Sequence, residues 1–563
     1  MRRTQKSGYY NQWVIMAGIL VVTSLSLQAK WLTIHNDFFQ CDLDGNKVQT
    51  RSGCLSKFGE TYYWYGCDAA MTNQTCYSSD DLLHWKNHGN MLTASRGTNR
   101  MDVIYNDSTK KYVMIMKWET EGTDNWCKLG IATSTEPTGP YTKLYDSLVY
   151  GAYTGDMSVF VDDDKKAYYC FESWNNDQKA QHLSLMTWDY LGLEKKLQTW
   201  SNSDREANCI MKRRGLYYYL TSKMVGIDPS ETQYWTAPKI EGPWTTKLIP
   251  IIAPGDGDRK SWDTQVDFVF AFKGTEDTVQ MYCGDRWVKP HPERNGDYVW
   301  LPITFTQKDS VVVDYYQDWE VDPDRGIWRA IDDKRNLALN KTATASSTSG
   351  GNSANNVTSP ATWKNYYNTK WVSESKDPQW ITVDLGEEMD VNRVILKWDD
   401  VNAKSFKIQV STDNTTWEDV FSTTKCGSRS VTDETFPTAT ARYVRMNGTE
   451  RGKTSGGYSL FDFMVLNDSV PPTATACNPG KPSVPAGAFL SGKYGVLRYS
   501  LPSGTSVKID IMDMRGKLAA VLVNGFRSAG EHEVALPPCL GRGLYIARMS
   551  YDNKSFGGIR IRL

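Results

Sequence analysis

Short segments rich in tyrosine and tryptophan recur along the first part of the chain at intervals of about fifty residues. Their apolar and polar positions alternate as in half-buried strands, and almost no stretch shows the period of an amphipathic helix. The five recurrences are Thr61–Tyr65, Lys111–Met114, Ala167–Tyr169, Leu216–Tyr219 and Val279–Tyr282. Repeats of this length, built from short strands and turns, are typical of propeller blades, and neither a sandwich nor a β-helix explains the interval. The pattern predicts an all-β fold in which residues 30–332 form a five-bladed β-propeller.

The remainder of the chain continues the strand pattern without this interval. Residues 333–468 contain the alternating runs Gln379–Gly386, Phe406–Asp413 and Ala441–Arg445, which predict a β-sandwich. Residues 469–490 are rich in proline, threonine and serine, which indicates a linker. Residues 491–563 again alternate and predict a small C-terminal β-sandwich.

The first 29 residues have the composition of a secretory signal peptide. Basic residues precede an apolar run from Trp13 to Leu27, and Ala29 is a small residue suited to cleavage. The run is too short for a membrane-spanning helix. We therefore expect a protein that is secreted or held at the cell surface, with no membrane anchor in the mature chain.

Composition excludes some partners and leaves others open. The 64 Lys and Arg residues balance the 65 Asp and Glu residues, so nothing in the charge favours a nucleic acid or an anionic membrane. The 21 Trp and 31 Tyr residues can serve as core, and some can serve as platforms on which sugar rings stack.

The 11 cysteines include no CxxC pair, and the six histidines do not cluster with them, so no zinc site is expected. We expect one or two disulfides in the N-terminal half, with the pairing open.

Each predicted blade also contains a short motif of polar and aromatic residues. The motifs are Asp44–Gln49, Tyr62–Gly66, Cys76–Ser79, Arg100–Asn106, Gly155–Met157, Arg205–Ala207, Trp262–Gln265, Gly284–Trp287 and Tyr298–Pro302. Together they resemble glycoside hydrolase family 43, and specifically its exo-β-1,3-galactanase branch. The resemblance implies an inverting glycoside hydrolase that acts on the backbone of arabinogalactan, a plant-type polysaccharide, or on its oligosaccharides.

The resemblance also implies which residues carry the chemistry. Inversion needs a general acid at the leaving oxygen and a base that activates water across the sugar ring, roughly 6.5–9.5 Å away. Glu206 falls on the family's catalytic acid, and Asp156 falls on the aspartate that orients this acid and tunes its pKa. Gln265 replaces the usual aspartate base and is thought to hold the attacking water. Taken singly, each residue also has an ordinary structural explanation. Glu206 can be a surface glutamate, Asp156 a turn residue, and Gln265 a polar residue that caps an inner strand.

Further residues are implied in substrate binding. Arg100 and Arg286 are expected to hydrogen-bond sugar hydroxyls. Trp287 and Trp300 are expected to pack on the sugar ring.

Several positions differ from the branch. Asn99 stands where the branch usually has a glutamate, and Asp102 is our candidate to replace it in substrate binding. Arg51 replaces a histidine and Cys67 a glutamate, which changes the sugar subsite. The first-blade aspartate of ordinary family-43 enzymes is missing from Gln49–Gly53, which favours a galactanase over an arabinofuranosidase or xylosidase.

Residues 333–468 resemble the discoidin, or F5/8 type C, fold shared by family-32 carbohydrate-binding modules. Trp363, Tyr366 and Tyr367 are its candidate accessory sugar-binding residues, whereas Trp371 is expected in the core. The loop Asn355–Pro360 lacks the Asp-Gly with which relatives often bind calcium, so no metal ligand is assigned. Whether the domain binds a structural calcium ion stays open, and the proposed chemistry requires no cofactor.

Residues 491–563 resemble the C-terminal sorting domains of bacterial type IX secretion substrates, which implies a secretion machinery as a partner. A third sugar-binding or spacer module is the alternative, because a fold does not determine a function. For the whole chain, two other functions stay open. One is a non-catalytic carbohydrate-binding protein, and the other is a family-43 arabinofuranosidase or xylosidase.

Overall fold

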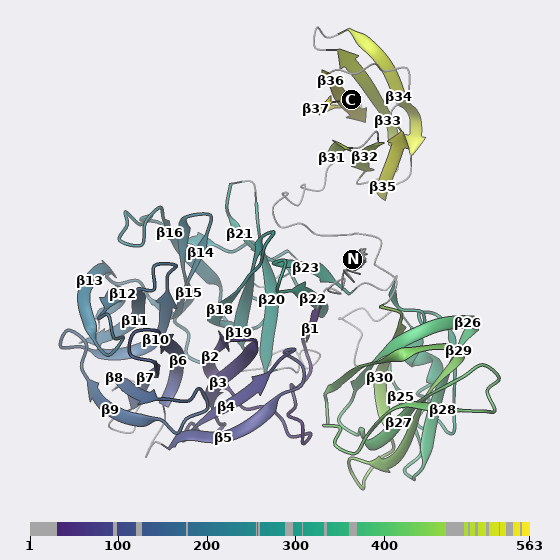
Figure 1. Ribbon diagram of the computed structural model, residues 1–563, viewed down its shortest axis with the longest axis horizontal. Coiled ribbons are helices and arrows are strands. Elements are labelled where there is room, and N and C mark those ends of the chain that lie inside the picture. The colour runs from purple at the N-terminus through teal and green to yellow at the C-terminus, as the bar shows by residue number, and fades with distance from the viewer. Residues whose placement is uncertain are drawn as a thin grey trace, which may run out of the picture.

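The computed structural model is built almost entirely of β-strands (Figure 1). It describes residues 31–562 except for residues 94–97, 120–126, 176–177, 255, 257–258, 288–296, 307, 332–334, 360–368, 469–488, 494–495, 502–504, 514–516, 528–529, 536–543 and 552–553. Within these residues there is no α-helix, and η2 (Ala354–Thr358) is a short 3-10 helix. The predicted fold class, an all-β chain with a propeller-like N-terminal domain followed by a discoidin-like sandwich, is confirmed.

Antiparallel strands make up the N-terminal domain: among the described residues, three sheets have four strands each, and one sheet of eight strands consists of two groups of four joined at the pair Thr154 and Cys127. The first group contains β2 (Arg51–Phe58), β3 (Thr61–Cys67), β4 (Asn73–Ser79) and β5 (Lys86–Thr93). The second and third contain β6 (Thr98–Asn106), β7 (Lys111–Glu119), β8 (Cys127–Ser134), β9 (Thr142–Ser147), β10 (Tyr153–Val161), β11 (Ala167–Asn175), β12 (Gln178–Met186) and β13 (Leu193–Trp200). The fourth and fifth contain β14 (Arg205–Arg213), β15 (Leu216–Lys223), β16 (Thr232–Ala237), β17 (Ile249–Pro250), β18 (Gln265–Lys273), β19 (Thr278–Asp285), β20 (Tyr298–Phe305) and β21 (Val311–Val313).

The first strands of these groups surround a common axis. Strands β2, β6, β10, β14 and β18 contact one another in this order, and β18 returns to contact β2. Apolar cores fill the spaces between neighbouring groups. The core between the fifth and first groups contains Trp64, Trp85, Trp300 and Trp319, so many aromatics are core residues. A small sheet of β1 (Leu32–His35), β22 (Asp318–Asp322) and β23 (Ile327–Ala330) joins the start of the domain to its end.

Each of these five inner strands has a break in its pairing register near its first residue. The breaks lie at Arg51/Cys54, Asn99/Met101, Thr154/Met157, Glu206/Cys209 and Val266/Phe268. A β-bulge of this kind interrupts the simple alternation of side chains and turns one of them in a new direction. Ser52, Arg100 and Ala207, which lie within these breaks, have positive φ angles of 50°, 53° and 53°. The bulges thus reorient side chains at the positions where the sequence motifs occur.

The discoidin-like domain has its own core. Its elements are β24 (Thr342–Ala345), η2, β25 (Trp371–Val372), β26 (Gln379–Trp398), β27 (Ala403–Ser411), β28 (Glu418–Thr423), β29 (Val431–Arg451) and β30 (Ser459–Leu466). The long strands β26 and β29 pair along most of their length, with register shifts between Asp384 and Met389 and between Val391 and Arg393. Trp371 is fully buried in the core, as predicted, and its indole Nε1 donates to the carbonyl oxygen of Ser347 at 3.0 Å.

The C-terminal segment forms two small sheets around a shared apolar core. One sheet contains β31 (Phe489–Lys493), β32 (Val496–Leu501) and β35 (Gly530–Ala535). The other contains β33 (Thr505–Asp513), β34 (Leu518–Arg527), β36 (Leu544–Tyr551) and β37 (Lys554–Arg562). The core between them includes Val507, Ile509 and Ile511 of β33, which alternate along the strand with polar residues as the sequence pattern predicts.

Buried charged side chains join the propeller-like and discoidin-like domains. The guanidinium of Arg393 in β26 donates to both carboxylate oxygens of Asp433, at 2.6 and 2.5 Å, and to Glu320 of β22 at 2.7 Å. The ring of His35 in β1 bonds Asp318 through Nδ1 at 2.7 Å and Asp433 through Nε2 at 3.0 Å. Burial opposes ionisation of Asp318, but the nearby cations outweigh it and lower its pKa to about 2. Such a network stabilises the interface only while every buried charge keeps its partner.

We expect Arg393→Met to lower the free energy of unfolding by about 3–5 kcal/mol, because Asp433 and Glu320 would stay buried without their shared cation. Urea denaturation followed by tryptophan fluorescence measures the loss. Arg442→Met is the matched control, since it removes an exposed ion pair with Asp384 in the same domain and should change stability little. Equal effects from the two variants would contradict a stabilising role for the buried network.

The described cysteines are all free thiols. They are Cys41, Cys54, Cys67, Cys76, Cys127, Cys170, Cys209, Cys283 and Cys426. The prediction of one or two disulfides in the N-terminal half is therefore wrong for this structure. Seven of these thiols are buried and pack as small apolar side chains, and burial raises the pKa of Cys283 well above its ordinary value. Cys477 and Cys539 lie outside the described residues.

The predicted signal peptide, residues 1–29, lies outside the described residues, as does nearly all of the predicted linker. In the part of the chain that the structure describes, no helix has the length and apolar character needed to cross a membrane.

Candidate active site

The bulged ends of the inner strands bring the three predicted catalytic residues together. The amide Nε2 of Gln265, at the start of β18, donates to Oε1 of Glu206, near the start of β14, at 2.7 Å. Asp156, in the bulge of β10, lies close enough to Glu206 for its negative charge to raise the pKa of that carboxyl group. An arginine from β6, Arg100, forms an ion pair with Asp156 at 3.2 Å. Four inner strands thus contribute to one polar cluster.

Glu206 has the environment of a general acid. Only 8% of its surface is exposed, which does not agree with the alternative of an ordinary surface glutamate. Burial, and then the charge of Asp156, raises the pKa of Glu206 to about 7. A carboxyl group with this pKa is still protonated in a substantial fraction of molecules near neutral pH and can donate its proton to a leaving oxygen.

Asp156 has the opposite character, although its side chain is also largely shielded from solvent, with 16% exposed. Burial disfavours its charged form, but the cations Arg100 and Lys117 outweigh burial and lower the pKa of Asp156. The ammonium of Lys117 lies 3.6 Å from Oδ1 of Asp156. Asp156 therefore stays an anion and keeps Glu206 protonated. Lys117 was not predicted from the sequence, where its signal is a single charged residue within the buried apolar run of β7.

Arg100 acts on other protein groups. It is 3% exposed, and its guanidinium contacts Asp267 of β18 and the carbonyl oxygen of Val266 as well as Asp156. The predicted contact with sugar hydroxyls does not agree with this placement. The physical reason is that a buried guanidinium needs nearby anions, and Asp156 and Asp267 supply them. Arg100 is a positioning residue.

Two more carboxylates that sequence reasoning missed support the first inner strand. Asp267 Oδ2 accepts a hydrogen bond from Gly53 N at 3.0 Å, and Asp285 Oδ2 accepts one from Ser52 N at 2.7 Å. Burial raises the pKa of Asp285 to about 6. The available signal was, again, a charged residue within an apolar strand, as in the Val266–Phe272 run of β18.

Two predicted sugar contacts are core residues instead. Arg286 is 1% exposed, and it pairs with Asp37 at 2.6 Å and donates to the carbonyl oxygen of Trp262. Trp300 is 5% exposed, and its ring lies 4.6 Å from that of Trp64, centroid to centroid. Neither side chain offers a surface to a ligand in this structure, so both predictions are corrected.

Trp287, another predicted sugar contact, is more exposed than Arg286 and Trp300. Its side chain is half-buried, and the guanidinium carbon of Arg51 lies 5.4 Å from its ring centroid. Trp287 and Arg51 both lie at positions that the sequence analysis assigned to the sugar subsite. Cys67 contributes only indirectly, because it is buried and its thiol donates to the carbonyl oxygen of Arg51 at 3.2 Å.

Asp102, the candidate to take the place of the missing glutamate, is partly exposed and lies between two inner strands. Its Oδ2 accepts a hydrogen bond from Val159 N at 2.6 Å, so it joins two neighbouring inner strands, β6 and β10. Burial raises its pKa to about 7. Asn99, at the position of the missing glutamate, donates from Nδ2 toward the sulfur of Met71 at 3.7 Å.

Among the described residues, no group of three or more His, Cys, Asp or Glu side chains is arranged to hold a metal ion. In the discoidin-like loop, Asn355 Oδ1 accepts from Ala343 N at 2.8 Å and Asn356 Nδ2 donates to the carbonyl oxygen of Lys370 at 2.8 Å. These amides therefore support the loop itself. The predicted accessory residues Trp363, Tyr366 and Tyr367 lie outside the described residues.

Comparison with known families identifies two domains in the chain. Residues 54–286 match the family described as glycosyl hydrolases family 43, and residues 342–462 match the F5/8 type C domain. The chain thus contains a family-43 domain and an F5/8 type C domain. The first supports a glycoside hydrolase, and both are consistent with an oligosaccharide or polysaccharide substrate.

Individual similar proteins include a β-D-galactofuranosidase of Aspergillus niger, which is 26% identical over 223 residues, or 34% of this chain. The chain spans 63% of the length of that relative. An exo-β-1,3-galactanase structure from Phanerochaete chrysosporium with β-1,3-galactotriose has a TM-score of 0.48 and 21% identity, covering 77% of this chain and 100% of that one. An exo-β-1,3-galactanase structure from Clostridium thermocellum has a TM-score of 0.48 and 22% identity, covering 90% and 100%.

Proposed function

We propose that the protein is a secreted, inverting exo-β-1,3-galactanase that removes sugars from the end of an arabinogalactan backbone. The observation that carries the proposal is the pair of Glu206 and Gln265. A nearly buried carboxyl group with a raised pKa is hydrogen-bonded to an amide at the position where most family-43 enzymes have an aspartate base. That exchange of aspartate for glutamine is the feature that favours the galactanase branch.

In the proposed reaction, Glu206 gives its proton to the glycosidic oxygen while water attacks the anomeric carbon from the opposite side. Asp156 remains ionised beside Arg100 and Lys117, and its charge keeps the proton on Glu206 until the leaving group takes it. The bond to the leaving sugar breaks as the bond to water forms, and the attacking water gives up one proton to solvent water. The product therefore has the inverted anomeric configuration.

Gln265 is suited to orient that water. Its Nε2 donates to Glu206 and to the carbonyl oxygen of Gly226 at 2.6 Å, so the amide oxygen is the atom that can accept a hydrogen bond from water. An inverting pair stands roughly 6.5–9.5 Å apart. The bound sugar must therefore separate Gln265 from Glu206 and take the place of their mutual hydrogen bond.

Incubation with a panel of glycans tests the proposal. The panel contains β-1,3-galactan, arabinogalactan, arabinan, xylan and an aryl β-D-galactofuranoside, and proton NMR identifies the released sugar and its first-formed anomer. We expect α-galactose from β-1,3-galactan. Release of arabinose or xylose would support the other family-43 activities, and release of galactofuranose would match the activity of the Aspergillus niger relative. Binding without release would indicate a non-catalytic carbohydrate-binding protein.

We expect Asp156→Asn to move the alkaline limb of the pH profile of kcat/KM to lower pH. Glu206 acts in its protonated form, so activity is present below its pKa and is lost as pH rises through it. Removing the neighbouring negative charge lowers this pKa from about 7, while burial still holds it above the ordinary value. The profile is measured on an unactivated galacto-oligosaccharide, with the exposed Asp309→Asn as control. If the alkaline limb does not move, the charge of Asp156 does not raise the pKa of Glu206.

We further propose that the F5/8 type C domain binds galactose-containing glycans. Residues 333–468 expressed alone should fold around their own core and be retarded weakly on an arabinogalactan affinity gel. A variant with Trp363, Tyr366 and Tyr367 replaced by alanine should lose the retardation but keep its circular dichroism spectrum, because sugar stacking needs the aromatic rings. If the wild-type domain migrates equally fast with and without the glycan in the gel, it does not bind the glycan and serves only as a spacer.

Export is proposed on sequence grounds. Residues 1–29 would direct the chain across the inner membrane, and residues 491–563 would then be recognised by a type IX-like secretion machinery. The supporting observation is that the C-terminal segment has its own small core and contributes none of the residues of the candidate active site.

A further inference from the structure

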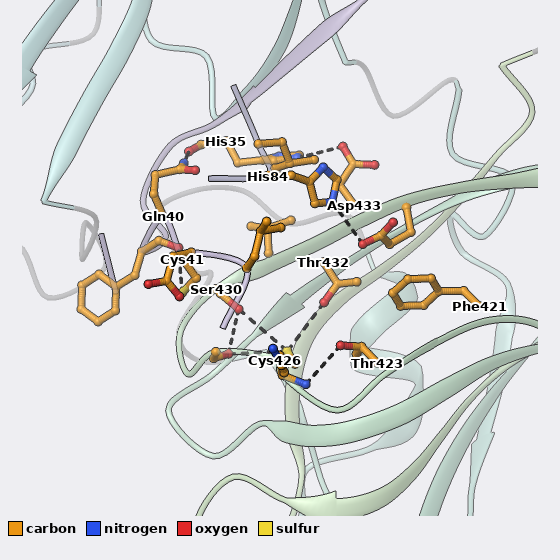
Figure 2. A pocket seen from close by; sticks show the side chains of 18 of the residues that line it. His35, Gln40, Cys41, His84, Phe421, Thr423, Cys426, Ser430, Thr432 and Asp433 are labelled. Atoms are coloured by element: carbon orange, nitrogen blue, oxygen red, sulfur yellow. Dashed lines mark hydrogen bonds and ion pairs between the residues drawn. The ribbon is translucent and has the colours of Figure 1, made fainter. Parts of the chain in front are cut away.

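A contact between two short segments joins the propeller-like and discoidin-like domains away from the candidate active site. The segment Phe39–Gly45 precedes the first group of strands, and the loop Lys425–Ser430 follows β28 (Figure 2). Phe39 N donates to the carbonyl oxygen of Arg429 at 2.9 Å, and the ammonium of Lys425 pairs with Asp44 at 2.5 Å. These two bonds hold the segment and the loop in one register.

The register depends on two glycines, one on each side. A Cβ atom at Gly45 would lie 2.3 Å from the carbonyl oxygen of Lys425, and one at Gly427 would lie 2.5 Å from the sulfur of Cys41. Contacts this short do not occur, so only glycine permits so close an approach. Cys41 therefore lies directly against the residue that follows Cys426.

The two cysteines also share a neighbour. The sulfur of Cys426 lies 3.9 Å from Oγ of Ser430, and a hydrogen bond from the same hydroxyl to Cys41 acts to lower the pKa of that thiol. Figure 2 shows Cys41, Ser430 and Cys426 together in the cleft between the domains, which has a volume of about 230 Å³. Both cysteines are only partly buried, unlike the seven thiols of the interior. The pair is therefore less enclosed than those seven thiols.

We propose that Cys41 and Cys426 are a site of disulfide formation that covalently joins the catalytic and F5/8 type C domains. The oxidant is a small disulfide. One cysteine thiolate attacks it and releases the first small thiol, and the second thiolate then attacks the mixed disulfide and releases the second. The two protein thiols lose two protons and two electrons in total, and the small disulfide is reduced to two thiols.

The surroundings of the thiols set the rate of this exchange. Burial raises the pKa of Cys41 to about 12 and also raises the pKa of Cys426. The thiolate is the attacking form, so it is scarce at neutral pH. The bridge should therefore form slowly near pH 7, and its rate should rise about tenfold for each unit by which the pH increases, as long as the pH stays below the thiol pKa values.

Peptide mapping of the full-length protein tests the proposal. The reduced protein is incubated with oxidised glutathione, remaining thiols are alkylated, and trypsin is applied without reductant. Cleavage after Lys30, Lys47, Lys425 and Arg429 leaves Cys41 and Cys426 each as the only cysteine of its peptide, residues 31–47 and 426–429. We expect one linked species whose mass is that of both peptides less two hydrogen atoms, and which separates on reduction.

The bridge should also raise the midpoint of thermal unfolding by several degrees, because it restricts the unfolded chain. Cys41→Ser and Cys426→Ser should each abolish both the linked peptide and this rise. Gly427→Ala is the matched control that keeps both thiols, and it should slow linkage because its Cβ displaces the sulfur of Cys41.

Other products of the same digestion overturn the proposal. They are glutathione or alkyl label retained on Cys41 and Cys426 after prolonged oxidation, or a bridge from either one to a different cysteine. If a serine variant does not fold, the wild-type peptide map alone gives the answer. None of these outcomes depends on the glycan that the enzyme cleaves.

Discussion

Replacing Glu206 with glutamine is expected to lower kcat on β-1,3-linked galacto-oligosaccharides by at least about a hundredfold, the usual scale of general acid catalysis. The change is nearly isosteric, and its carbonyl oxygen can still accept the hydrogen bond that Gln265 now donates to Glu206. The site should therefore keep its shape and lose only the proton. Turnover of purified protein, measured by released galactose, gives the loss directly.

An aryl β-galactoside with an acidic leaving group separates this effect from a structural one. Such a leaving group departs without a proton, so Glu206→Gln should reduce its hydrolysis far less. Glu194→Gln, an exposed glutamate in the same domain, is the matched control and should retain full activity on both substrates. Near-normal rates for Glu206→Gln on both substrates would place the general acid elsewhere.

Replacing Gln265 with alanine is expected to abolish measurable turnover while changing the Kd of a galacto-oligosaccharide by less than about tenfold. The amide acts on the attacking water, which is bound productively only on the way to the transition state. Its donor bond to the carbonyl oxygen of Gly226, which a sugar between Gln265 and Glu206 need not break, holds the amide so that its oxygen can face the water. Kinetics and isothermal titration calorimetry on one preparation separate the two quantities.

Two comparisons sharpen this test. Gln233→Ala removes a partly exposed glutamine from β16 and should leave kcat unchanged. Gln265→Glu places a second carboxyl group against Glu206, so the two groups should titrate far apart and add an acid limb to the pH profile, below which both groups carry a proton. Full activity in Gln265→Ala would move the water-orienting group to another residue and weaken the galactanase proposal.

The three catalytic candidates could be assigned from sequence because the short motifs that contain them resemble family 43, and the resemblance implies their roles. Glu206, Asp156 and Gln265 each lie at or next to a bulge, and the structure places them in one cluster. Lys117 and Asp267 belong to the same cluster but were missed, because each is an isolated charge in an apolar strand. Lys117 and Asp267 reach their partners, Asp156 and Arg100, only when β7 and β18 pack beside the bulged strands.

The sequence failed where a motif contains both exposed and buried residues. Arg286 and Trp287 are adjacent, yet Arg286 is enclosed with Asp37 while Trp287 remains half-buried near Arg51. Asp37 is far away in the chain, so nothing in the motif indicates that it neutralises Arg286. Trp300 shows the same limit, because its apolar neighbours come from the first group of strands.

The sequence alone determined the all-β class, the order of the domains and the burial of Trp371, because alternation and repeat length are local properties of the chain. Tertiary structure decided the bulges that reorient the inner-strand residues, and the burial that raises the pKa of Glu206 to about 7. It also decided that Cys41 meets Cys426 across the domain boundary. The physical reason is that burial, charge pairing and thiol proximity depend on which distant strands meet, and distant residues are brought together only when the strands pack.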